Sequence, residues 1–570
     1  MNRTEYRCAH TWPRDRRGRR LLTRVAAGVI GGGMVLAAGS PASAQFRSAA
    51  AAPPGPTLGW QAREFQDSVN GPDNAVDIQY WFDDITNPGE PVNYVFITGW
   101  QTTSDGATVF ATHKYEADYT GQGENEPIFS AFYPDPSGAT GTNKAVAMAF
   151  DPDTGDVYVT GESSGPNGQD YVTIRYNKDL GEVWTSVSRY NGPANGDDIP
   201  VDIVHYGSTG YVVAVTGRSL GVGTGDDIAT VLYNTLDGTL ASGWWPSGVN
   251  GPAGERRYDG PGVGPDRPVG VGVIEIVVKG GDGGYVGVFV SGTESTVGEG
   301  DNIVTLAYTQ FGFLSAVRSF DGPESGDDVA TAMVSRTKRD QGGVYVPEFS
   351  FISTCGYTPG AVQGDTDYVV VSYWHFINGC HLPVSSCLED PYVFGDSEFR
   401  IWGGPAPAAL SDDRPLAIDI RADAWLWITG RVREAEGTAY DIGTIQYDMY
   451  GTGSWTQANP AGPDPTAEWI WGVLDDTNEW GTAVDAHGIV AYVGGRVSRG
   501  GVNSYAMFKF DVRMPFTPVW TALHRALQAS DTIEAIVALD NAVPDPVFVA
   551  GGSGLSATGK DQLTLRYDQP

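Results

Sequence analysis

Aspartates recur in this sequence at positions where their carboxylates could bind a ligand or take part in catalysis. Two stretches 130 residues apart, RYNGPANGDDIPVDI (189–203) and SFDGPESGDDVATAM (319–333), place paired aspartates directly before an alternating apolar run. A second class of aspartate stands at the start of runs such as DYVTIRY (170–176) and DNIVTLAY (301–308). Carboxylates gathered at one place can bind a hard cation such as Ca²⁺. The candidate ligand-binding or cation-binding residues are Asp170, Asp198, Asp227, Asp301, Asp328, Asp413 and Asp441.

The other short motifs give no catalytic residue. Two G-x-S-x-G matches, at 161–165 and 217–221, would expose a nucleophilic serine if a helix followed them. Another alternating apolar run follows each match instead, so we interpret both as turns. The DPDTGD stretch at 151–156 resembles a calcium loop but lacks the downstream glutamate, and we favour a hairpin turn there. The seven histidines are scattered without metal-ligand spacing.

A short apolar run that ends in glycine recurs eight times and indicates the elements that position these aspartates. The runs are YVFITG (94–99), VYVTG (157–161), VVAVTG (212–217), VFVSG (288–292), FISTCG (351–356), LWITG (426–430), AYVGG (491–495) and VFVAG (547–551). A second alternating run, such as DYVTIRY or DIGTIQY, follows each of them after a polar gap. Alternation with period 2 predicts strands. The full unit contains four strands joined by Gly, Pro, Asn and Asp turns.

Four-stranded antiparallel units that recur every 56 to 75 residues predict an all-β fold, a β-propeller with eight four-stranded blades. Seven blades are the alternative if one unit is irregular. The last unit ends at LTLRYDQP, after its third strand, whereas residues 59–74 supply a strand and an opening turn without an earlier blade. We therefore expect residues 59–68 to complete the last blade and close the ring. Closure would remove the exposed sheet edges.

This topology would bring both classes of aspartate to one face. The turns from blade to blade and the loops between second and third strands lie at the same end of the strands. There the carboxylates could recruit Ca²⁺ or a cationic ligand. Alternatively, each aspartate could simply cap its own turn. Both interpretations stay open, and the sequence does not identify a metal.

The repeat VYVTG–ESSGPNGQ–DYVTIRYNKDLGEVW–TSVSRYNGPANGDD resembles the bacterial secreted β-propeller repeat family often labelled SBBP. The match is close at 157–233, good at 288–333 and 426–455, and loose near 340–410 and 456–530. The resemblance implies a propeller outside the cytoplasm and no common enzymatic activity. The family label suggests seven blades, whereas this sequence shows eight units.

The N-terminal segment has a different composition from the rest. An Arg-rich stretch leads into VAAGVIGGGMVLAAG and then the small residues ASA at 42–44, a pattern typical of a secretory signal peptide. We expect residues 1–44 to be the signal peptide, 45–58 a linker, and 59–570 a single β-propeller domain. The two arginines at 19–20 hint at twin-arginine export, and the choice between that route and the general secretory route stays open.

The chain is strongly acidic, with a formal net charge of −33. Cleavage after Ala44 removes eight arginines and two acidic residues, a net +6, and takes the charge to −39. This charge argues against a nucleic-acid partner, because phosphate neutralisation needs Lys and Arg. No later apolar run approaches the roughly 20 residues of a membrane helix. We expect no integral membrane segment after cleavage, and a secreted, periplasmic or cell-surface location.

Three cysteines remain beyond the signal segment. Cys380 and Cys387 are close in sequence and are the candidate disulfide in an oxidising compartment. That pairing leaves Cys355 as a buried free thiol.

Two functions fit these observations. The first is a non-enzymatic binding or scaffold module that acts through its acidic loops, with an unknown protein or glycan as partner and Ca²⁺ as the candidate ligand. The alternative is an extracellular carbohydrate-active enzyme with paired carboxylates at the mouth of the propeller as acid and base. We favour the non-enzymatic module.

Overall fold

The computed structural model is all-β. It describes residues 57–64, 73–83, 92–119, 125–134, 140–151, 153–206, 211–248, 251–277, 284–298, 300–337, 349–360, 364–376, 397–402, 412–420, 425–433, 439–448, 467–471, 478–487, 490–499, 502–511, 518–524, 532–538, 547–556 and 559–568. These residues form thirty-two strands in eight four-stranded antiparallel sheets, and no helix occurs among them. Eight blades, rather than the alternative of seven, are therefore confirmed.

The blades are numbered here in chain order, and each lists its strands from first to fourth. Blades 1 to 4 are β2 Asn74–Asp83, β3 Val92–Thr102, β4 Thr108–Glu116, β5 Phe129–Tyr133; β6 Asn143–Phe150, β7 Val157–Ser164, β8 Gln169–Tyr176, β9 Ser188–Tyr190; β10 Asp198–His205, β11 Val212–Leu220, β12 Asp226–Asn234, β13 Glu255–Tyr258; β14 Arg267–Val277, β15 Gly284–Ser295, β16 Asp301–Tyr308, β17 Leu314–Phe320. Blades 5 to 8 are β18 Val329–Thr337, β19 Phe349–Pro359, β20 Thr366–Phe376, β21 Ser397–Trp402; β22 Arg414–Ile420, β23 Trp425–Arg433, β24 Tyr440–Asp448, β25 Ala467–Trp471; β26 Asn478–His487, β27 Val490–Arg499, β28 Val502–Asp511, β29 Pro518–His524; β30 Thr532–Ala538, β31 Val547–Ser556, β32 Gly559–Asp568, β1 Thr57–Glu64.

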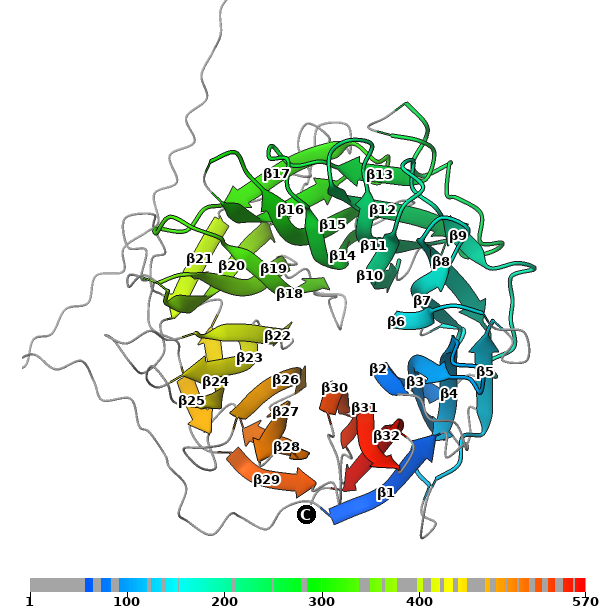
Figure 1. Cartoon of the computed structure of the whole chain (residues 1–570), viewed down its shortest axis with the longest axis vertical. Helices are drawn as coiled ribbons and strands as arrows, with labels where there is room; N and C mark the ends of the chain where they lie inside the picture. The colour runs from blue at the N-terminus through cyan, green and yellow to red at the C-terminus, as the bar shows by residue number, and fades with distance from the viewer. Residues whose placement is uncertain are drawn as a thin grey trace, which may run out of the picture. The chain divides into compact units, whose positions relative to one another are not determined.

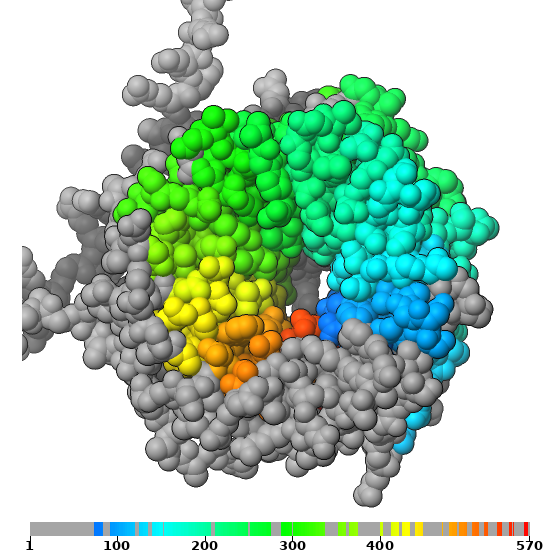
Figure 2. Space-filling view, in the orientation of Figure 1, coloured from blue at the N-terminus to red at the C-terminus, as the bar shows by residue number. Residues whose placement is uncertain are grey.

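The first strands of the blades form the inner wall of the ring. Each first strand contacts the first strands of both neighbouring blades, including β30 of blade 8 against β2 of blade 1. In Figure 1 these strands surround the centre, and the space-filling view shows a hollow there (Figure 2). Apolar side chains of adjacent blades share their core clusters; one cluster joins Val212 and Trp245 of blade 3 to Val288 and Leu306 of blade 4. The blades are thus held by the burial of their faces against each other.

The ring closes as the sequence predicts. β1 pairs with β32 in an antiparallel register that runs from Thr57 opposite Asp568 to Glu64 opposite Gln562. An N-terminal strand therefore completes the last blade, and it begins at Thr57, two residues earlier than expected. No other blade draws a strand from a distant part of the chain.

A close backbone approach explains the recurring glycine. In all eight blades the first strand skips one residue in its pairing with the second strand, which marks a β-bulge. The glycine that ends each apolar run lies opposite this bulge; Gly217, for example, pairs with Pro200. A Cβ on Gly217 would lie 2.2 Å from the Ile199 carbonyl oxygen, and one on Gly161 would lie 2.1 Å from that of Lys144. Only glycine permits this contact.

Buried hydroxyl pairs hold the second and third strands together. Thr160 and Thr173 lie 3.1 Å apart between their Oγ1 atoms in blade 2, and Thr216 and Thr230 lie 3.0 Å apart in blade 3. Each pair satisfies two polar groups inside an apolar sheet, which would otherwise carry a desolvation cost. This hydroxyl pair explains why threonine precedes the glycine in the V-T-G runs.

Several predictions concern residues outside the described part of the chain. The signal peptide and most of the linker lie there, as do Cys380 and Cys387. Cys355, in contrast, is a buried free thiol in β19, as the sequence predicts.

We expect Gly217→Ala to lower the free energy of unfolding by about 1–3 kcal/mol, because the added methyl overlaps the Ile199 carbonyl. Urea titration followed by tryptophan fluorescence measures the change. Gly243→Ala is the matched control, since nothing lies within 4 Å of its added Cβ. Equal stability of the two variants would contradict this explanation of the repeated glycine.

Candidate functional site: the acidic loop face and the inner ring

Both classes of acidic loop meet on one face, as predicted. We define the loop face as the described residues 191–198, 259–266 and 321–328 of the blade-to-blade turns and 165–170, 221–227 and 295–301 of the second-to-third-strand loops, including the strand residues that flank them. The Asp301 amide donates to Asp327 Oδ1 at 3.1 Å, and the Gln169 amide donates to Asp197 Oδ1 at 3.0 Å. Each bond joins one loop class to the other. The opposite end of the blades carries the remaining turns and is called the turn face.

In three blade-to-blade turns the last aspartate caps the turn. The amides of Gly192, Gly260 and Gly322 each donate at 2.6 Å to a carboxylate six residues later. The acceptors are Asp198, Asp266 and Asp328. This geometry explains the repeated stretch x-G-P-x-x-G-x-D, because the glycine amide is the group that the aspartate binds.

The same carboxylate also reaches the second strand of its own blade. Asp266 Oδ1 accepts the Ser295 amide at 2.8 Å, and Asp413 Oδ1 accepts the Arg433 amide at 2.8 Å. Burial raises the pKa of Asp266 and of Asp328 to about 6. Burial also raises the pKa of Asp198. The candidates Asp198, Asp328 and Asp413 therefore serve the fold first.

Two candidates of the third-strand class pair with arginines of the fourth strand. Asp170 binds Arg189 of β9 at 2.7 Å, and Asp227 binds Arg257 of β13 at 2.7 Å. Asp301 is half-buried, and burial followed by the like charge of Asp327 raises its pKa. Asp441 lies in β24 opposite Val432. The structure thus places all seven candidates at one end of the strands but in different local settings.

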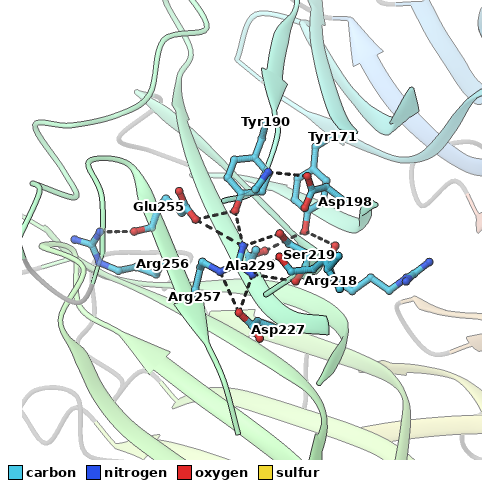
Figure 3. A network of polar contacts seen from close by, with 12 residues as sticks. Tyr171, Tyr190, Asp198, Arg218, Ser219, Asp227, Ala229, Glu255, Arg256 and Arg257 are labelled. Atoms are coloured by element: carbon cyan, nitrogen blue, oxygen red, sulfur yellow. Dashed lines mark hydrogen bonds and ion pairs between the residues drawn. The ribbon is translucent and has the colours of Figure 1, made fainter. Parts of the chain in front are cut away.

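Arg257 is the centre of a polar network in blade 3 (Figure 3). Its guanidinium donates to Ser219 Oγ at 2.6 Å, to Tyr190 Oη at 2.9 Å, and to Asp227 Oδ2 at 2.7 Å. Tyr190 in turn donates to Glu255 Oε1 at 2.7 Å. Such a fully bonded arginine fork fixes the outer strand to the loop face.

Both G-x-S-x-G serines accept a hydrogen bond from an arginine of a fourth strand. Ser219 is the penultimate residue of β11, beside Arg257. Ser163 donates to Asn143 Oδ1 at 2.7 Å and accepts from Arg189 at 2.8 Å. Both serines lie in second strands, β7 and β11, so the interpretation as turns is wrong for them, and only Gly165 and Gly221 belong to the loops. A third strand, not a helix, follows each match, as the sequence predicts.

The DPDTGD stretch forms the hairpin turn between β6 and β7, also as predicted. Asp151 accepts the Asp153 amide at 3.0 Å and the Thr154 hydroxyl at 2.9 Å, and Gly155 has a φ of +78°. Asp156 binds Arg175. In the described residues, no group of three or more His, Cys, Asp or Glu side chains could hold a metal ion.

Sequence reasoning missed a second set of carboxylates, which lies on the inner ring. The Met148 amide donates to Asp77 at 2.8 Å, and the Val271 amide donates to Asp202 at 2.8 Å. Asp419 and Asp485 accept the amides of Ala486 and Ala538, each at 2.6 Å. Every bond crosses from one first strand to the first strand of the next blade. The recurring stretches AVDI, PVDI, AIDI and AVDA were the signal that could have found them.

Burial dominates the titration of these inner-ring carboxylates. It raises the pKa of Asp77 to about 7 and that of Asp202 to about 6. It also raises the pKa of Asp419, with a further contribution from the charge of Asp485. Backbone amides oppose the shift by stabilising the ionised form. The inner ring therefore holds carboxyl groups that change charge near neutral pH.

The described part of the chain contains no helix that is long and apolar enough to cross a membrane.

We expect the free energy of unfolding to fall between pH 5 and pH 8, and Asp77→Asn to reduce that fall by about 1–3 kcal/mol. The folded state holds the Asp77 proton up to about pH 7, whereas an aspartate in the unfolded chain has its ordinary pKa of 3.8, so deprotonation over this interval favours unfolding. Urea titrations at several pH values measure the difference. Asp153→Asn, at an exposed turn, is the control and should keep the parent slope. Parallel curves for Asp77→Asn and the parent would contradict the assignment.

No protein-family model matches the chain, and no curated protein matches it significantly. Among solved structures, Sqt1 from Chaetomium thermophilum is similar at 10% identity with a TM-score of 0.36, over 71% of this chain and 80% of that one. A fructofuranosidase from Schwanniomyces occidentalis complexed with fructose is similar at 8% identity with a TM-score of 0.25, over 89% of this chain and 94% of that one. Likenesses of this size carry no argument about function. The strand pairing of the chain itself shows that it is an eight-bladed β-propeller.

Proposed function

We propose that this chain is a secreted, non-enzymatic β-propeller of the bacterial secreted repeat type, which binds a partner through its loop face. The observation that carries the proposal is the difference in exposure between neighbouring aspartates of the blade-to-blade turns. Asp198 and Asp328 are buried as turn caps, while the preceding Asp197 and Asp327 are exposed. Each exposed carboxylate is held by a backbone amide of the adjoining loop. The face therefore presents fixed negative charges without needing to order them on binding.

The composition of the chain supports an extracellular cationic partner. The segment resembling a signal peptide directs the chain out of the cytoplasm, and the chain then resides in the periplasm, at the cell surface or in the medium. A formal charge of −33 makes binding of cations and of cationic surfaces favourable. An unknown protein with a basic surface, or a glycan with cationic groups, fits the loop face by charge.

The carboxylates of the loop face are poorly arranged for catalysis. General acid–base catalysis needs carboxylates that are free to exchange protons with a substrate. Asp170 and Asp227 are neutralised by Arg189 and Arg257, and Asp198 is engaged with a backbone amide. These contacts support a binding role over the enzymatic alternative at this face.

An extracellular carbohydrate-active enzyme is the second candidate, and the inner ring is what favours it. Asp419 and Asp485 lie on neighbouring blades, and the charge of Asp485 raises the pKa of Asp419. A pair of neighbouring carboxyl groups is the arrangement that glycoside hydrolysis uses. Reducing-sugar release from a panel of polysaccharides, lost in Asp485→Asn, would support the enzyme and overturn the non-enzymatic proposal.

We expect cationic ligands to bind through the loop face. The loop aspartate triple, Asp197→Asn, Asp259→Asn and Asp327→Asn, should weaken binding of a fluorescein-labelled oligolysine about five- to tenfold at low ionic strength. The turn aspartate triple, Asp153→Asn, Asp179→Asn and Asp237→Asn, makes the same charge change at exposed positions of the turn face. Fluorescence anisotropy compares the two. Equal weakening by both triples would show unspecific attraction and contradict the proposal.

Calcium is the candidate small ligand of the same face. The neighbouring carboxylates of Asp301 and Asp327 repel each other, which Ca²⁺ would relieve. We expect millimolar Ca²⁺ added after EDTA to raise the melting temperature of the cleaved protein by mass action, and Asp301→Asn to reduce the rise. Asp153→Asn is the control. An unchanged melting temperature would remove Ca²⁺ from the proposal and leave the cationic partner.

A further inference from the structure

Three valines are exposed to solvent at the tips of adjoining loops on the loop face. Val222, Val263 and Val297 are 74%, 92% and 76% exposed. Val222 and Val297 occupy equivalent places, since each precedes a glycine with a φ of +86° in the loop between a second and a third strand. Val263 lies in the turn that joins blade 3 to blade 4. These positions carry no core packing that would explain an apolar side chain.

The three loops form one continuous surface. The Gly262 amide donates to the Ser295 carbonyl at 2.8 Å, and the Gly264 amide donates to Ser295 Oγ at 3.1 Å. On the other side, the Asp266 amide donates to the Asp226 carbonyl at 2.6 Å. The turn that carries Val263 is therefore bonded to the blade 3 loop and to the blade 4 loop at once. Those loops are closed in turn by bonds from Gly221 to Gly225 and from Thr296 to Gly300.

The corresponding loops of blades 1 and 2 have no valine at their tips. The loop of blade 1 has Ser104 and Asp105, and the loop of blade 2 has Pro166 and Asn167. Among the loop tips that the structure describes, those of blades 3 and 4 carry valine and those of blades 1 and 2 do not, so the repeat itself does not require it. Clusters of exposed apolar side chains commonly mark interaction sites.

Negative charge surrounds this valine patch, which we define as Val222, Val263 and Val297. Asp259 is exposed on the same turn as Val263, and Asp301 follows the loop of Val297. Among the basic groups nearby, Arg218 is paired with Asp226 and Arg257 with Asp227, while Arg267 is exposed. The excess charge is negative, so an occupant must offer positive charge as well as apolar surface.

We propose that the valine patch is the docking site for a Lys- or Arg-rich polypeptide segment that presents small aliphatic side chains. The inference deepens the proposed function and rests on it, because it assigns the chemistry of the cationic partner. The aliphatic side chains cover the valines, and the basic ones reach Asp259, Asp301 and the neighbouring exposed carboxylates. Rigid, hydrogen-bonded loops let the segment bind without ordering the receptor.

The probe that tests this is a short fluorescein-labelled peptide of alternating lysine and valine, compared with a lysine–serine and a glutamate–valine peptide. The loop valine triple, Val222→Ser, Val263→Ser and Val297→Ser, changes only exposed side chains. The control triple is Val183→Ser, Leu236→Ser and Phe311→Ser, which are exposed apolar residues of the turn face. Coincident urea unfolding curves verify that every variant is folded.

At about 0.15 M salt, we expect the lysine–valine peptide to bind the parent more tightly than either other peptide. The loop valine triple should weaken it about tenfold, and the control triple should leave it unchanged. Equal binding of the lysine–valine and lysine–serine peptides, or no effect of the loop valine triple, would overturn this inference. The proposed function would still stand if oligolysine binding depends on the loop aspartates. Loss of that dependence as well would overturn both. Dimerisation of the parent that the loop valine triple abolishes would make a second copy of this chain the occupant and overturn the peptide.

Discussion

The antiparallel pairing of β1 with β32 is the interaction on which the rest of the structure depends. It joins the two ends of the described chain within one blade and lets β30 contact β2, so that every first strand has a neighbour on both sides. Each blade can then bury both faces against other blades, which is the main source of its stability. Without that pairing, blades 1 and 8 would each expose an apolar face and an open edge.

Inside the closed ring, most recurring residues have a role in the backbone arrangement. Glycine stands where a second strand approaches the bulge of a first strand, and threonine before it pairs with another hydroxyl. Aspartate ties the entering turn to its blade, and inner-ring aspartates such as Asp77 and Asp202 carry hydrogen bonds from blade to blade. Repetition of a residue in this chain therefore indicates architecture first. The features that break the repeat, such as the valines of blades 3 and 4, are the better indicators of binding.

The sequence predicts the strands, their number and the closure of the ring well. Period-2 alternation and the recurring G-P and V-T-G motifs are local signals. It also predicts that both classes of aspartate share a face, because that follows from strand direction alone. The partners of those aspartates could not be predicted, because Arg189 and Arg257 lie on fourth strands at no fixed spacing from Asp170 and Asp227. The inner-ring carboxylates were visible as V-D-I, but their role depends on amides of the next blade, about 70 residues away in sequence.

The positions of β1 and β32 affect how the molecule would be oriented if it were attached to a surface. Thr57 pairs with Asp568, so β1 begins and β32 ends at the same end of blade 8. Because β32 is a third strand, that end belongs to the turn face. A tether attached before β1 or after β32 would leave from the side opposite the acidic loops. A short tether to a surface at either of these strand ends would therefore direct the loop face away from that surface.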